Sequence, residues 1–289
     1  MPTDTIDMRD ALGIARAVRA GRLSAVEVAR QALDDIGARH AQFNAISTCF
    51  DTRALEAAAR IDACVRAGRD AGPLAGVPFV VKSNFDVAGY ATVAGSPTRL
   101  RAPAARCDAV MVDRLVQAGA VPVAATHMDE FACGATGVNP HFGAVRLPAD
   151  PSRMTGGSSS GSAAAVAAGH VPLALGSDTN GSISRASCAV RRMGDQADTR
   201  PAVDGRLRAV CVFARRGRRV RRESRRSLRA LRRAVRYEPR RLTRRARAAA
   251  RRRADRGIRT PCRCAGASCG RASERVLRAT RPCAGRADR

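Results

Sequence analysis

The hydrophobic pattern of the first part of the chain switches repeatedly between helical spacing and short apolar runs. Ser24 and Glu27 stand three residues apart, just before apolar positions at helical spacing. They predict a helix that opens with a capping box, in which the hydroxyl and the carboxylate bind backbone N–H groups left free at a helix start. A second helix is predicted to begin near Asp51 and to continue through the alanine-rich stretch 55–65.

The segments that follow alternate strands with helices. Strands are predicted at 77–82, 121–125 and 171–175, where short runs of Val, Ala and Leu are bounded by Gly or Pro. Helices are predicted at 108–118, which has one apolar face, and at 160–168, which consists of small residues. Strands that alternate with helices are typical of a layered α/β core with a largely parallel sheet. We therefore expect an α/β fold with a largely parallel sheet.

Charge divides the chain into two parts. Residues 1–184 contain 17 Lys+Arg and 17 Asp+Glu, whereas residues 185–289 contain 35 basic and 8 acidic residues, so the net charge of +27 lies in the second part. Arginine makes up about a third of that part, and little apolar surface is available to offset the entropy of ordering it. We expect an N-terminal helical part at 1–70, a core at 71–183 and a disordered Arg-rich tail at 184–289.

Composition also limits the classes of function. No stretch is long and apolar enough to span a bilayer, the first residues do not resemble a signal peptide, and the early cysteines lack disulfide or CxxC spacing. We expect a cytoplasmic protein without a cofactor. We also expect no metal site, since Cys262, Cys264, Cys269 and Cys283 do not have zinc-finger spacing. The basic tail would bind phosphates non-specifically and in a salt-dependent way, which leaves nucleic-acid binding as an alternative function.

Two segments rich in Gly and Ser, at 156–162 and 176–183, flank the predicted helix at 160–168. They could form a flexible linker, a phosphate-binding loop or the backbone of a catalytic site. A linker does not run directly into a buried helix and strand, and the Gly-Lys-Ser/Thr ending of a P-loop is absent. The glycines favour a tightly turning backbone that exposes its N–H groups.

A nucleophilic serine in these segments needs a base. The histidines at 40, 127, 141 and 170 are scattered, and none lies in a recognisable triad motif. Lys82 is the only lysine of the chain and ends a predicted apolar strand. A desolvated lysine has a lowered pKa and can act as a neutral base, whereas the alternative is a surface lysine without a role.

Four segments together resemble the amidase signature family over residues 8–183: Gly-Val-Pro-Phe-Val-Val-Lys at 76–82, Thr-His-Met-Asp-Glu-Phe at 126–131, Gly-Gly-Ser-Ser-Ser-Gly-Ser at 156–162 and Gly-Ser-Asp-Thr-Asn-Gly-Ser-Ile at 176–183. The resemblance implies an α/β/α layered core with a mixed, largely parallel sheet, truncated in this chain, and a Ser–cis-Ser–Lys triad that hydrolyses a small C–N amide substrate. It assigns the lysine to Lys82, the cis-serine to Ser158 and the nucleophile to Ser182. It further implies an oxyanion hole formed by the backbone N–H groups of Thr179, Asn180, Gly181 and Ser182.

Within the family, the segments Asp-Thr-Asn-Gly-Ser-Ile and Met-Asp-Glu-Phe-Ala-Cys-Gly are most similar to the carboxybiuret/biuret hydrolase-like branch. The A subunit of the glutamyl-tRNA amidotransferase is the alternative. That subunit usually has Gly where Asn180 stands.

The resemblance ends after Ile183, where the family continues with Arg-Val-Pro and later Lys-Pro-Thr. If the reading frame is shifted by one base, the codons for Met193–Thr199 can encode Trp-Gly-Ile-Lys-Pro-Thr, which ends as the family segment does. This agreement predicts that residues 184–289 are an out-of-frame translation of an amidase gene. The product would be a truncated amidase with little or no hydrolase activity.

Overall fold

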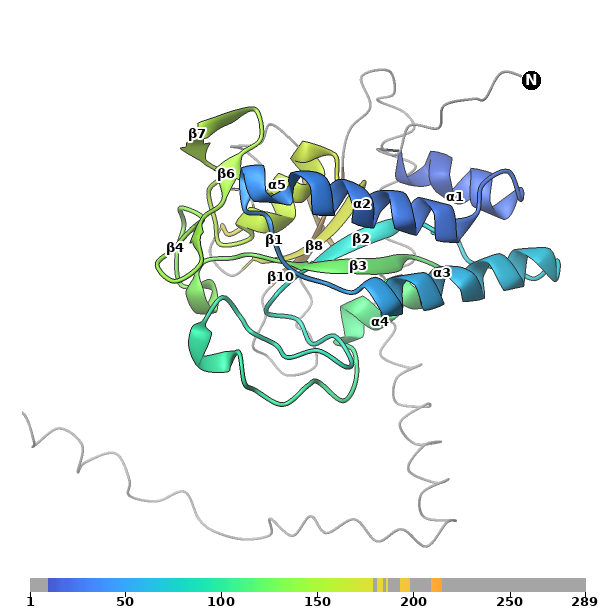
Figure 1. The fold of residues 1–289 in the computed structure, drawn as a ribbon, viewed down its shortest axis with the longest axis horizontal. Helices are drawn as coiled ribbons and strands as arrows, with labels where there is room; N and C mark the ends of the chain where they lie inside the picture. The colour runs from blue at the N-terminus through green and yellow to red at the C-terminus, as the bar shows by residue number, and fades with distance from the viewer. Residues whose placement is uncertain (1–9, 179–180, 184–185, 187–192, 198–208, 215–289) are drawn as a thin grey trace, which may run out of the picture. The chain divides into compact units, whose positions relative to one another are not determined.

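The computed structural model describes residues 10–178, 181–183, 186, 193–197 and 209–214 (Figure 1). The helices are α1 (Ala11–Arg19), α2 (Ala25–Phe43), α3 (Asp51–Arg66), α4 (Val110–Gln117) and α5 (Ser160–Ala168), with short 3₁₀ turns at Pro97–Arg99 and Glu130–Ala132. The strands are β1 (Ile46–Cys49), β2 (Pro78–Lys82), β3 (Val121–Thr126), β4 (Val138–Asn139), β5 (Gly143–Ala144), β6 (Arg146–Leu147), β7 (Asp150–Met154), β8 (Leu173–Asp178), β9 (Met193–Ala197) and β10 (Ala209–Ala214). Every helix and strand predicted from the hydrophobic pattern is confirmed.

Helix α2 begins where the sequence predicts, but its cap depends on a distant residue. The Ser24 hydroxyl accepts the N–H groups of Val26 and Glu27 at 3.2 and 3.4 Å. The carboxylate of Asp62, on α3, accepts the N–H of Ala25 at 2.7 Å and the hydroxyl of Ser24 at 2.7 Å. Within the described residues, the Glu27 side chain accepts no hydrogen bond from the Ser24 N–H. The part of the predicted capping box that involves Glu27 is therefore wrong. Asp62 supplies the carboxylate instead, and it ties the start of α2 to α3.

The main sheet has six strands in the order β1-β3-β2-β8-β10-β9. The three central strands β3, β2 and β8 are parallel, whereas β1, β10 and β9 pair in antiparallel fashion. All five residues of β2 are buried, as expected for a strand covered on both faces. The mixed sheet with a parallel centre confirms the expected α/β class. Because β1 pairs with β3, the N-terminal part contributes to the same sheet as the core.

The direction in which the chain crosses the sheet reverses at β2. From β2 the chain passes through α4 to β3 on one side, and from β3 it returns through α5 to β8 on the other side. Right-handed crossovers place two such helices on opposite faces of the sheet, as Figure 1 shows for α4 and α5. Ligands of open α/β sheets bind beyond the carboxyl ends of the strands at such a reversal.

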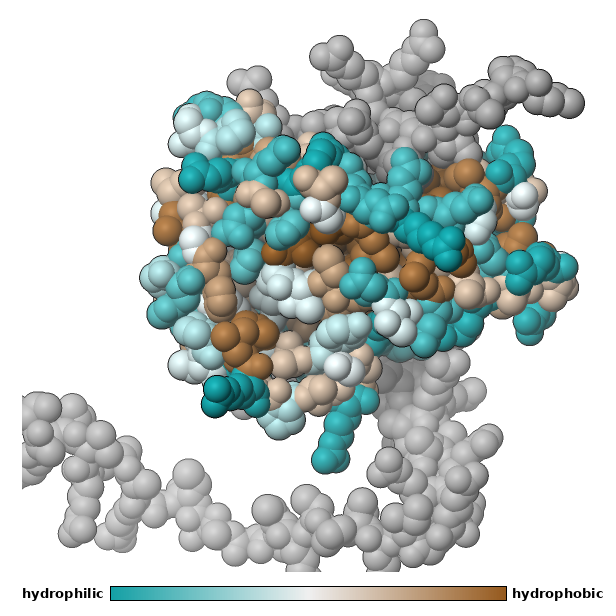
Figure 2. Space-filling model, viewed as in Figure 1, coloured by the Kyte–Doolittle hydropathy of each residue, from teal (hydrophilic) through white to brown (hydrophobic). Residues whose placement is uncertain are grey.

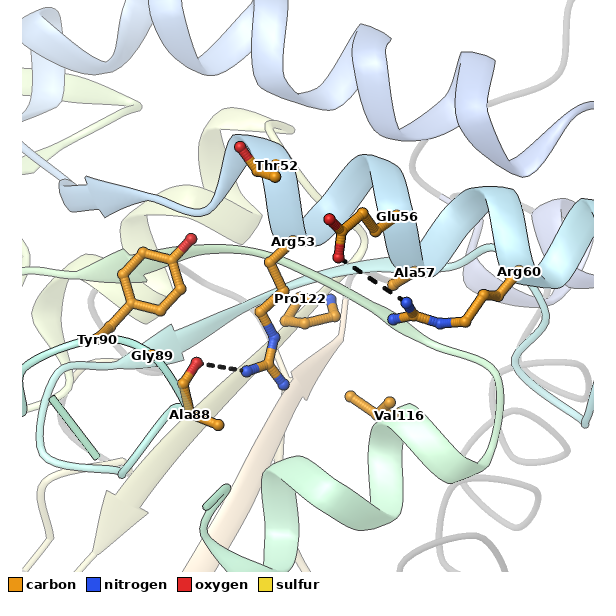
Figure 3. Close-up of a pocket in the computed structure, with 10 residues that line it drawn as sticks. All are labelled: Thr52, Arg53, Glu56, Ala57, Arg60, Ala88, Gly89, Tyr90, Val116 and Pro122. Carbon is orange, nitrogen blue, oxygen red and sulfur yellow. Dashed lines mark hydrogen bonds and ion pairs between the residues drawn. The ribbon is translucent and has the colours of Figure 1, made fainter. Parts of the chain in front are cut away.

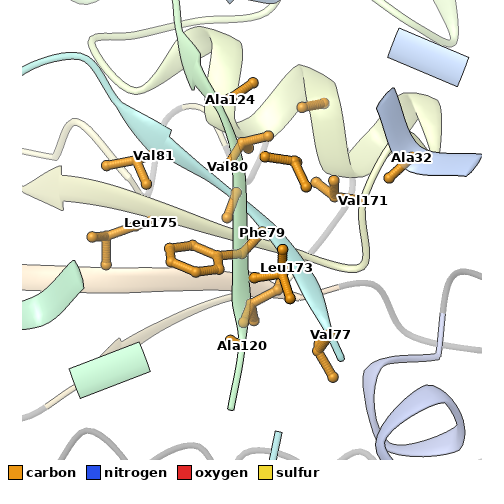
Figure 4. Close-up of a cluster of buried hydrophobic side chains, with 14 of the residues drawn as sticks. Ala32, Val77, Phe79, Val80, Val81, Ala120, Ala124, Val171, Leu173 and Leu175 are labelled. Carbon is orange, nitrogen blue, oxygen red and sulfur yellow. The ribbon is translucent and has the colours of Figure 1, made fainter. Parts of the chain in front are cut away.

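The core lies between the central strands and the helices that cover them (Figure 4). Phe79 and Val80 point to opposite faces of β2, and both are fully buried. Helix α5 packs tightly against the sheet because its residues are small. A Cβ atom added at Gly161 would lie 2.3 Å from the carbonyl oxygen of Ala45 and 2.6 Å from that of His127. On the outside, hydrophilic residues follow α2, and hydrophobic residues lie between α2 and α3 (Figure 2).

Two stretches of the region expected to lack regular structure form strands. β10 pairs with β8 over six residue pairs, from Ala209 opposite Asp178 to Ala214 opposite Leu173, and β9 pairs with β10. The sequence of β10, Ala-Val-Cys-Val-Phe-Ala, is a short apolar run in an otherwise Arg-rich region. The free edge of β8 offers such a run backbone partners. Apart from Ala186 and these strands, residues 184–289 lie outside the described residues.

Helix α1, strand β1 and the hairpins β4–β5 and β6–β7 were not predicted. The hairpin strands are mostly two residues long, too short to display an alternating pattern. Helix α1 has a conventional cap, in which the Asp10 carboxylate accepts the N–H of Leu12 at 3.0 Å.

Candidate active site

The candidate site lies where the central parallel strands end. Lys82 is the last residue of β2, Ser177 and Asp178 are the last residues of β8, and Asp129 follows β3 after two residues. All four side chains are buried, and Lys82 is 0% exposed. Parallel strands bring their carboxyl ends to the same edge of a sheet, so residues far apart in the chain meet here.

The amine of Lys82 is held between two serine hydroxyls. Nζ donates to Ser158 Oγ at 2.8 Å and to Ser177 Oγ at 2.9 Å. Asn84 Nδ2 also donates to Ser177 Oγ, at 3.0 Å. Two predicted site residues, Lys82 and Ser158, are therefore in direct contact, and both side chains are inaccessible to solvent.

The surroundings of Lys82 favour its neutral form. Burial lowers its pKa from 10.5 to about 7, while the carboxylates of Asp129 and Asp178 act in the opposite direction. No carboxylate of the described residues forms an ion pair with it within 4 Å. Near neutral pH, a substantial fraction of this amine has a free lone pair and can accept a proton.

Ser158 lies at the start of the small-residue helix α5. The peptide bond between Gly157 and Ser158 is cis. The next residue, Ser159, donates its hydroxyl to the carbonyl of Ser177 at 3.0 Å and its N–H to the carbonyl of Ser182 at 3.3 Å. These two bonds connect the Ser158 segment with both ends of the second Gly/Ser-rich segment.

Ser182 is buried, with 8% of its surface exposed. Asp178 holds its segment: the N–H groups of Gly181 and Ser182 donate to Asp178 Oδ1 at 2.6 and 3.0 Å, and that of Ile183 donates to Oδ2 at 3.1 Å. The carboxylate thus caps the turn after β8 as an N-cap residue does. Within the described residues no hydrogen bond joins the hydroxyls of Ser158 and Ser182.

The predicted oxyanion donors divide into two pairs. Thr179 and Asn180 lie outside the described residues. The N–H groups of Gly181 and Ser182 are placed beside the site but donate to Asp178. An oxyanion that used these two groups would compete with the Asp178 carboxylate.

Sequence reasoning missed four residues that surround Lys82: Asn84, Asp129, Ser177 and Asp178. Ser177 and Asp178 belong to a segment already recognised as chemically important, and Asp129 belongs to Thr-His-Met-Asp-Glu-Phe. Their position at or just after predicted strand ends was the available signal.

The histidines do not take part in this site. His170 Nδ1 contacts Asp35 Oδ2 at 2.6 Å, and His141 Nε2 lies 3.4 Å from Glu130 Oε2. The rings of His127 and Phe142 pack with centroids 5.6 Å apart. None of the described histidines contacts Ser158 or Ser182, in agreement with the absence of a histidine triad motif.

A cavity of about 510 Å³ lies elsewhere, between α3 and the loop that follows β2 (Figure 3). Its lining includes Arg53, Tyr90 and Pro122, the last at the opposite end of β3 from the site. Arg53 donates to the carbonyl of Ala88 at 2.8 Å and pairs with Asp108 at 2.5 Å. Neither Lys82 nor any of the serines of the Gly/Ser-rich segments lines it, so this cavity is separate from the candidate site.

Two further features are settled for the described part of the chain only. No group of three or more His, Cys, Asp or Glu side chains there is arranged to hold a metal ion. No helix of that part has the length and hydropathy needed to cross a membrane.

Comparisons with known proteins agree with the motifs. The sequence pattern of the Amidase family matches residues 27–189. The chain is 49% identical over 170 residues to AtzE, the 1-carboxybiuret hydrolase subunit of Pseudomonas sp. strain ADP, covering 59% of this chain and 37% of that protein. It is 46% identical over 177 residues to the A subunit of the glutamyl-tRNA(Gln) amidotransferase of Symbiobacterium thermophilum, covering 61% of this chain and 36% of that protein.

Solved structures give the same result. A vestigial protein complex described as revealing the origins of an s-triazine catabolic enzyme is 39% identical, with a TM-score of 0.66 over 71% of this chain and 46% of that one. A bacterial aryl acylamidase of the amidase signature enzymes is 26% identical, with a TM-score of 0.68 over 73% of this chain and 45% of that one. The chain spans little more than a third of the length of the curated relatives named above. From the family match over more than half of its residues, together with these likenesses, the chain belongs to the amidase family.

Proposed function

We propose that this site is built to hydrolyse the C–N bond of a small amide, with Ser182 as nucleophile, Ser158 as proton relay and Lys82 as base. The observation that carries the proposal is the buried contact between Lys82 Nζ and Ser158 Oγ at 2.8 Å, made by an amine whose pKa is lowered by burial to about 7. Such an amine can accept a proton at neutral pH and return it later.

The proposed reaction proceeds in two steps. Lys82 accepts a proton from Ser158, which takes one from Ser182 while Ser182 Oγ attacks the amide carbon. Collapse of the tetrahedral intermediate passes a proton to the leaving amine and leaves an acyl group on Ser182, which water then hydrolyses. The missing hydrogen bond between the two serine hydroxyls does not oppose this order, since catalytic hydrogen bonds often tighten only when substrate is bound.

The segment from Thr179 to Ser182 is proposed to stabilise the oxyanion through its backbone N–H groups. Removal of one such donor costs about 3–4 kcal/mol of transition-state stabilisation in comparable enzymes. Because Gly181 and Ser182 donate to Asp178, the oxyanion must share or displace these bonds.

The substrate class follows from the relatives only in part. One relative belongs to a 1-carboxybiuret hydrolase, and another is the A subunit of an amidotransferase. We propose a small linear amide of the carboxybiuret type, because the chain is 49% identical to the first of these relatives. Comparison of hydrolysis of biuret derivatives with hydrolysis of glutamine separates this substrate from that of the amidotransferase alternative.

We also propose that the chain in this form turns over amides weakly or not at all. Residues 184–289 are read as an out-of-frame product, and the match covers only 37% of the carboxybiuret hydrolase subunit. Sequencing the coding DNA across codons 175–205 tests the frame. A single-base difference that restores Trp-Gly-Ile-Lys-Pro-Thr would show that the natural protein is a full-length amidase without the basic tail. An unaltered frame would mean a damaged gene or an acquired Arg-rich extension, and measured amide turnover would then contradict the proposed inactivity.

The test of the site is covalent labelling of the full chain with a serine-reactive sulfonyl fluoride, mapped by mass spectrometry. We expect Ser182 to be labelled, the label to be absent in Ser182→Ala, and no change in Ser152→Ala, which alters an exposed serine. Lack of reaction at Ser182 in folded protein would refute its role as nucleophile. Soluble full-length chain that turns over amides, with turnover abolished by Ser182→Ala, would refute the proposed inactivity.

The Arg-rich tail supports a separate, weaker alternative. A tail with this charge would bind any nucleic acid through phosphate contacts, with an affinity that falls steeply as salt rises. Base preference that disappears on truncation after Ile183 would favour an evolved nucleic-acid-binding role over the out-of-frame origin.

A further inference from the structure

Asp129 is a buried carboxylate without an assigned role. It is 2% exposed, and within the described residues its Oδ1 atom is buried without a hydrogen-bond partner. Its Oδ2 atom accepts one bond, from the N–H of Thr136 at 3.2 Å. A buried charge with so few partners is costly unless the surrounding structure uses it.

Two glycines leave room for this carboxylate. A Cβ atom added at Gly157 would lie 2.3 Å from Asp129 Oδ1, and one added at Gly134 would lie 2.2 Å from Oδ2. Asp129 therefore lies against the residue that immediately precedes Ser158. Any side chain at either position would have to displace the carboxylate.

The loop bound by Asp129 in turn holds the Ser158 segment. Gly157 donates its N–H to the carbonyl of Ala135 at 2.8 Å, and Gly156 donates its N–H to that of Thr136 at 3.1 Å. One carboxylate thus contacts both sides of the backbone pairing that fixes the residues before Ser158. Ser158 is the hydroxyl to which Lys82 donates.

We propose that Asp129 is a positioning residue for the Lys82–Ser158 pair, whose carboxylate holds the Gly157 backbone in place and stabilises the ammonium that Lys82 becomes when it accepts a proton. The inference rests on the proposed role of Lys82 as base.

The electrostatics agree with this placement. Among the described residues, the charges of Asp129 and Asp178 raise the pKa of Lys82 against the effect of burial. The effect of Asp129 is the larger of the two. Asp178 is engaged by three backbone N–H groups, whereas Asp129 accepts one. Hydrogen bonds disperse the charge of Asp178, so the Asp129 carboxylate is the less compensated of the two.

The chain offers an unusually direct test, because Lys82 is its only lysine. Full-length protein grown with ¹³C-labelled lysine gives one lysine side-chain signal, and the chemical shift of its Cε, followed against pH, reports the protonation of Lys82. In Asp129→Asn and Asp129→Ser we expect the midpoint to fall by about one pH unit, the effect of losing a nearby opposite charge. The control is Asp62→Asn, which also removes a carboxylate that accepts backbone N–H groups but lies on α3.

An unchanged midpoint in the Asp129 variants, or an equal fall in Asp62→Asn, would overturn the inference. Failure of both Asp129 variants to fold would assign the carboxylate to loop packing alone and would also overturn it. Because the titration needs no turnover, it is independent of the labelling of Ser182. A lowered midpoint with an unreactive Ser182 would contradict the proposed function and leave the positioning role in place.

Discussion

Two clusters of titratable groups, a buried one around Lys82 and a half-buried one around Asp35, differ in what surrounds the charge. At the candidate site, the hydrogen-bond partners of Lys82 Nζ among the described residues are the hydroxyls of Ser158 and Ser177, and burial lowers its pKa to about 7. In the second cluster, Asp35 contacts His170 at 2.6 Å and receives two bonds from Arg39, at 2.8 and 2.6 Å.

The pKa shifts in the second cluster reflect these contacts. Burial acts to raise the pKa of Asp35, but the hydrogen bonds from His170 and Arg39 outweigh it and the pKa is lowered. Burial lowers the pKa of His170, and Asp35 opposes that effect. Asp35, which accepts hydrogen bonds from charged partners, keeps its charge, whereas Lys82, which contacts neutral hydroxyls, can lose it. The charged contacts of the Asp35 cluster suit a structural role, whereas the neutral surroundings of Lys82 suit proton transfer.

The largest expected effect comes from replacement of the amine. In Lys82→Met, labelling of Ser182 by a sulfonyl fluoride at pH 8 should fall about 10²- to 10⁴-fold, the usual contribution of a general base. Arg39→Met, which alters the other cluster, should leave the labelling rate unchanged. The rates are measured by mass spectrometry. If Ser182 were labelled in Lys82→Met at the wild-type rate, Lys82 would not act as the base, and the proposed difference between the two clusters would be wrong.

A second effect appears in stability against pH. The pKa of Lys82 is about 7 in the folded chain and 10.5 for the free side chain, so the unfolded state binds more protons between these values. The free energy of unfolding should therefore gain a few kcal/mol from Lys82 as pH rises from 7 to 10.5, and lose it again as pH falls to 7. Urea unfolding of wild type and Lys82→Met measures this rise. If the free energy of unfolding rose equally with pH in the two proteins, Lys82 would not be desolvated in the folded chain.

The Asp35 cluster should respond to mutation in stability alone. Asp35→Asn removes the charge that pairs with Arg39 and His170 and should lower the free energy of unfolding by about 1–3 kcal/mol, in the range for hydrogen bonds to charged groups. The partial exposure of Asp35 keeps the effect modest. The pH midpoint of Lys82, followed by ¹³C-lysine NMR, should not move. A shift of that midpoint would show that the two clusters are coupled.

The last effect, confined to acidic pH, concerns His127, which is largely buried and whose Nδ1 has no hydrogen-bond partner within the described residues. Burial, with a smaller contribution from His40, lowers its pKa from 6.5 to about 4. Its contribution to stability is present above pH 6.5 and is lost as pH falls through 4. His127→Gln should remove this acid-side loss, which amounts to about 3 kcal/mol for a shift of this size, in urea unfolding. If the variant lost the same stability between pH 6.5 and 4 as the wild type, the His127 ring would be already protonated or solvated in the folded chain.

Local sequence determined much of the fold. The apolar run ending in Lys82 predicted a strand, and the small residues of 160–168 predicted a helix; the structure contains both. Such predictions succeed because burial and backbone hydrogen bonding leave a periodic record in neighbouring residues. The Gly/Ser-rich segments, the single lysine and the family motifs that contain them likewise identified Lys82, Ser158 and Ser182 as candidate site residues from the sequence alone.

Only the tertiary structure decided which residues surround them. Ser177 is 95 residues from Lys82, and Asp62 is 37 residues from the helix start that it caps. Periodicity reports which face of an element is buried but not which strands become neighbours. The order β3-β2-β8 brings the strand ends together, and that order places Asp129 and Ser177 beside the lysine. The identity of the proposed base was therefore readable from the chain, whereas the environment that lowers its pKa depended on strand pairing.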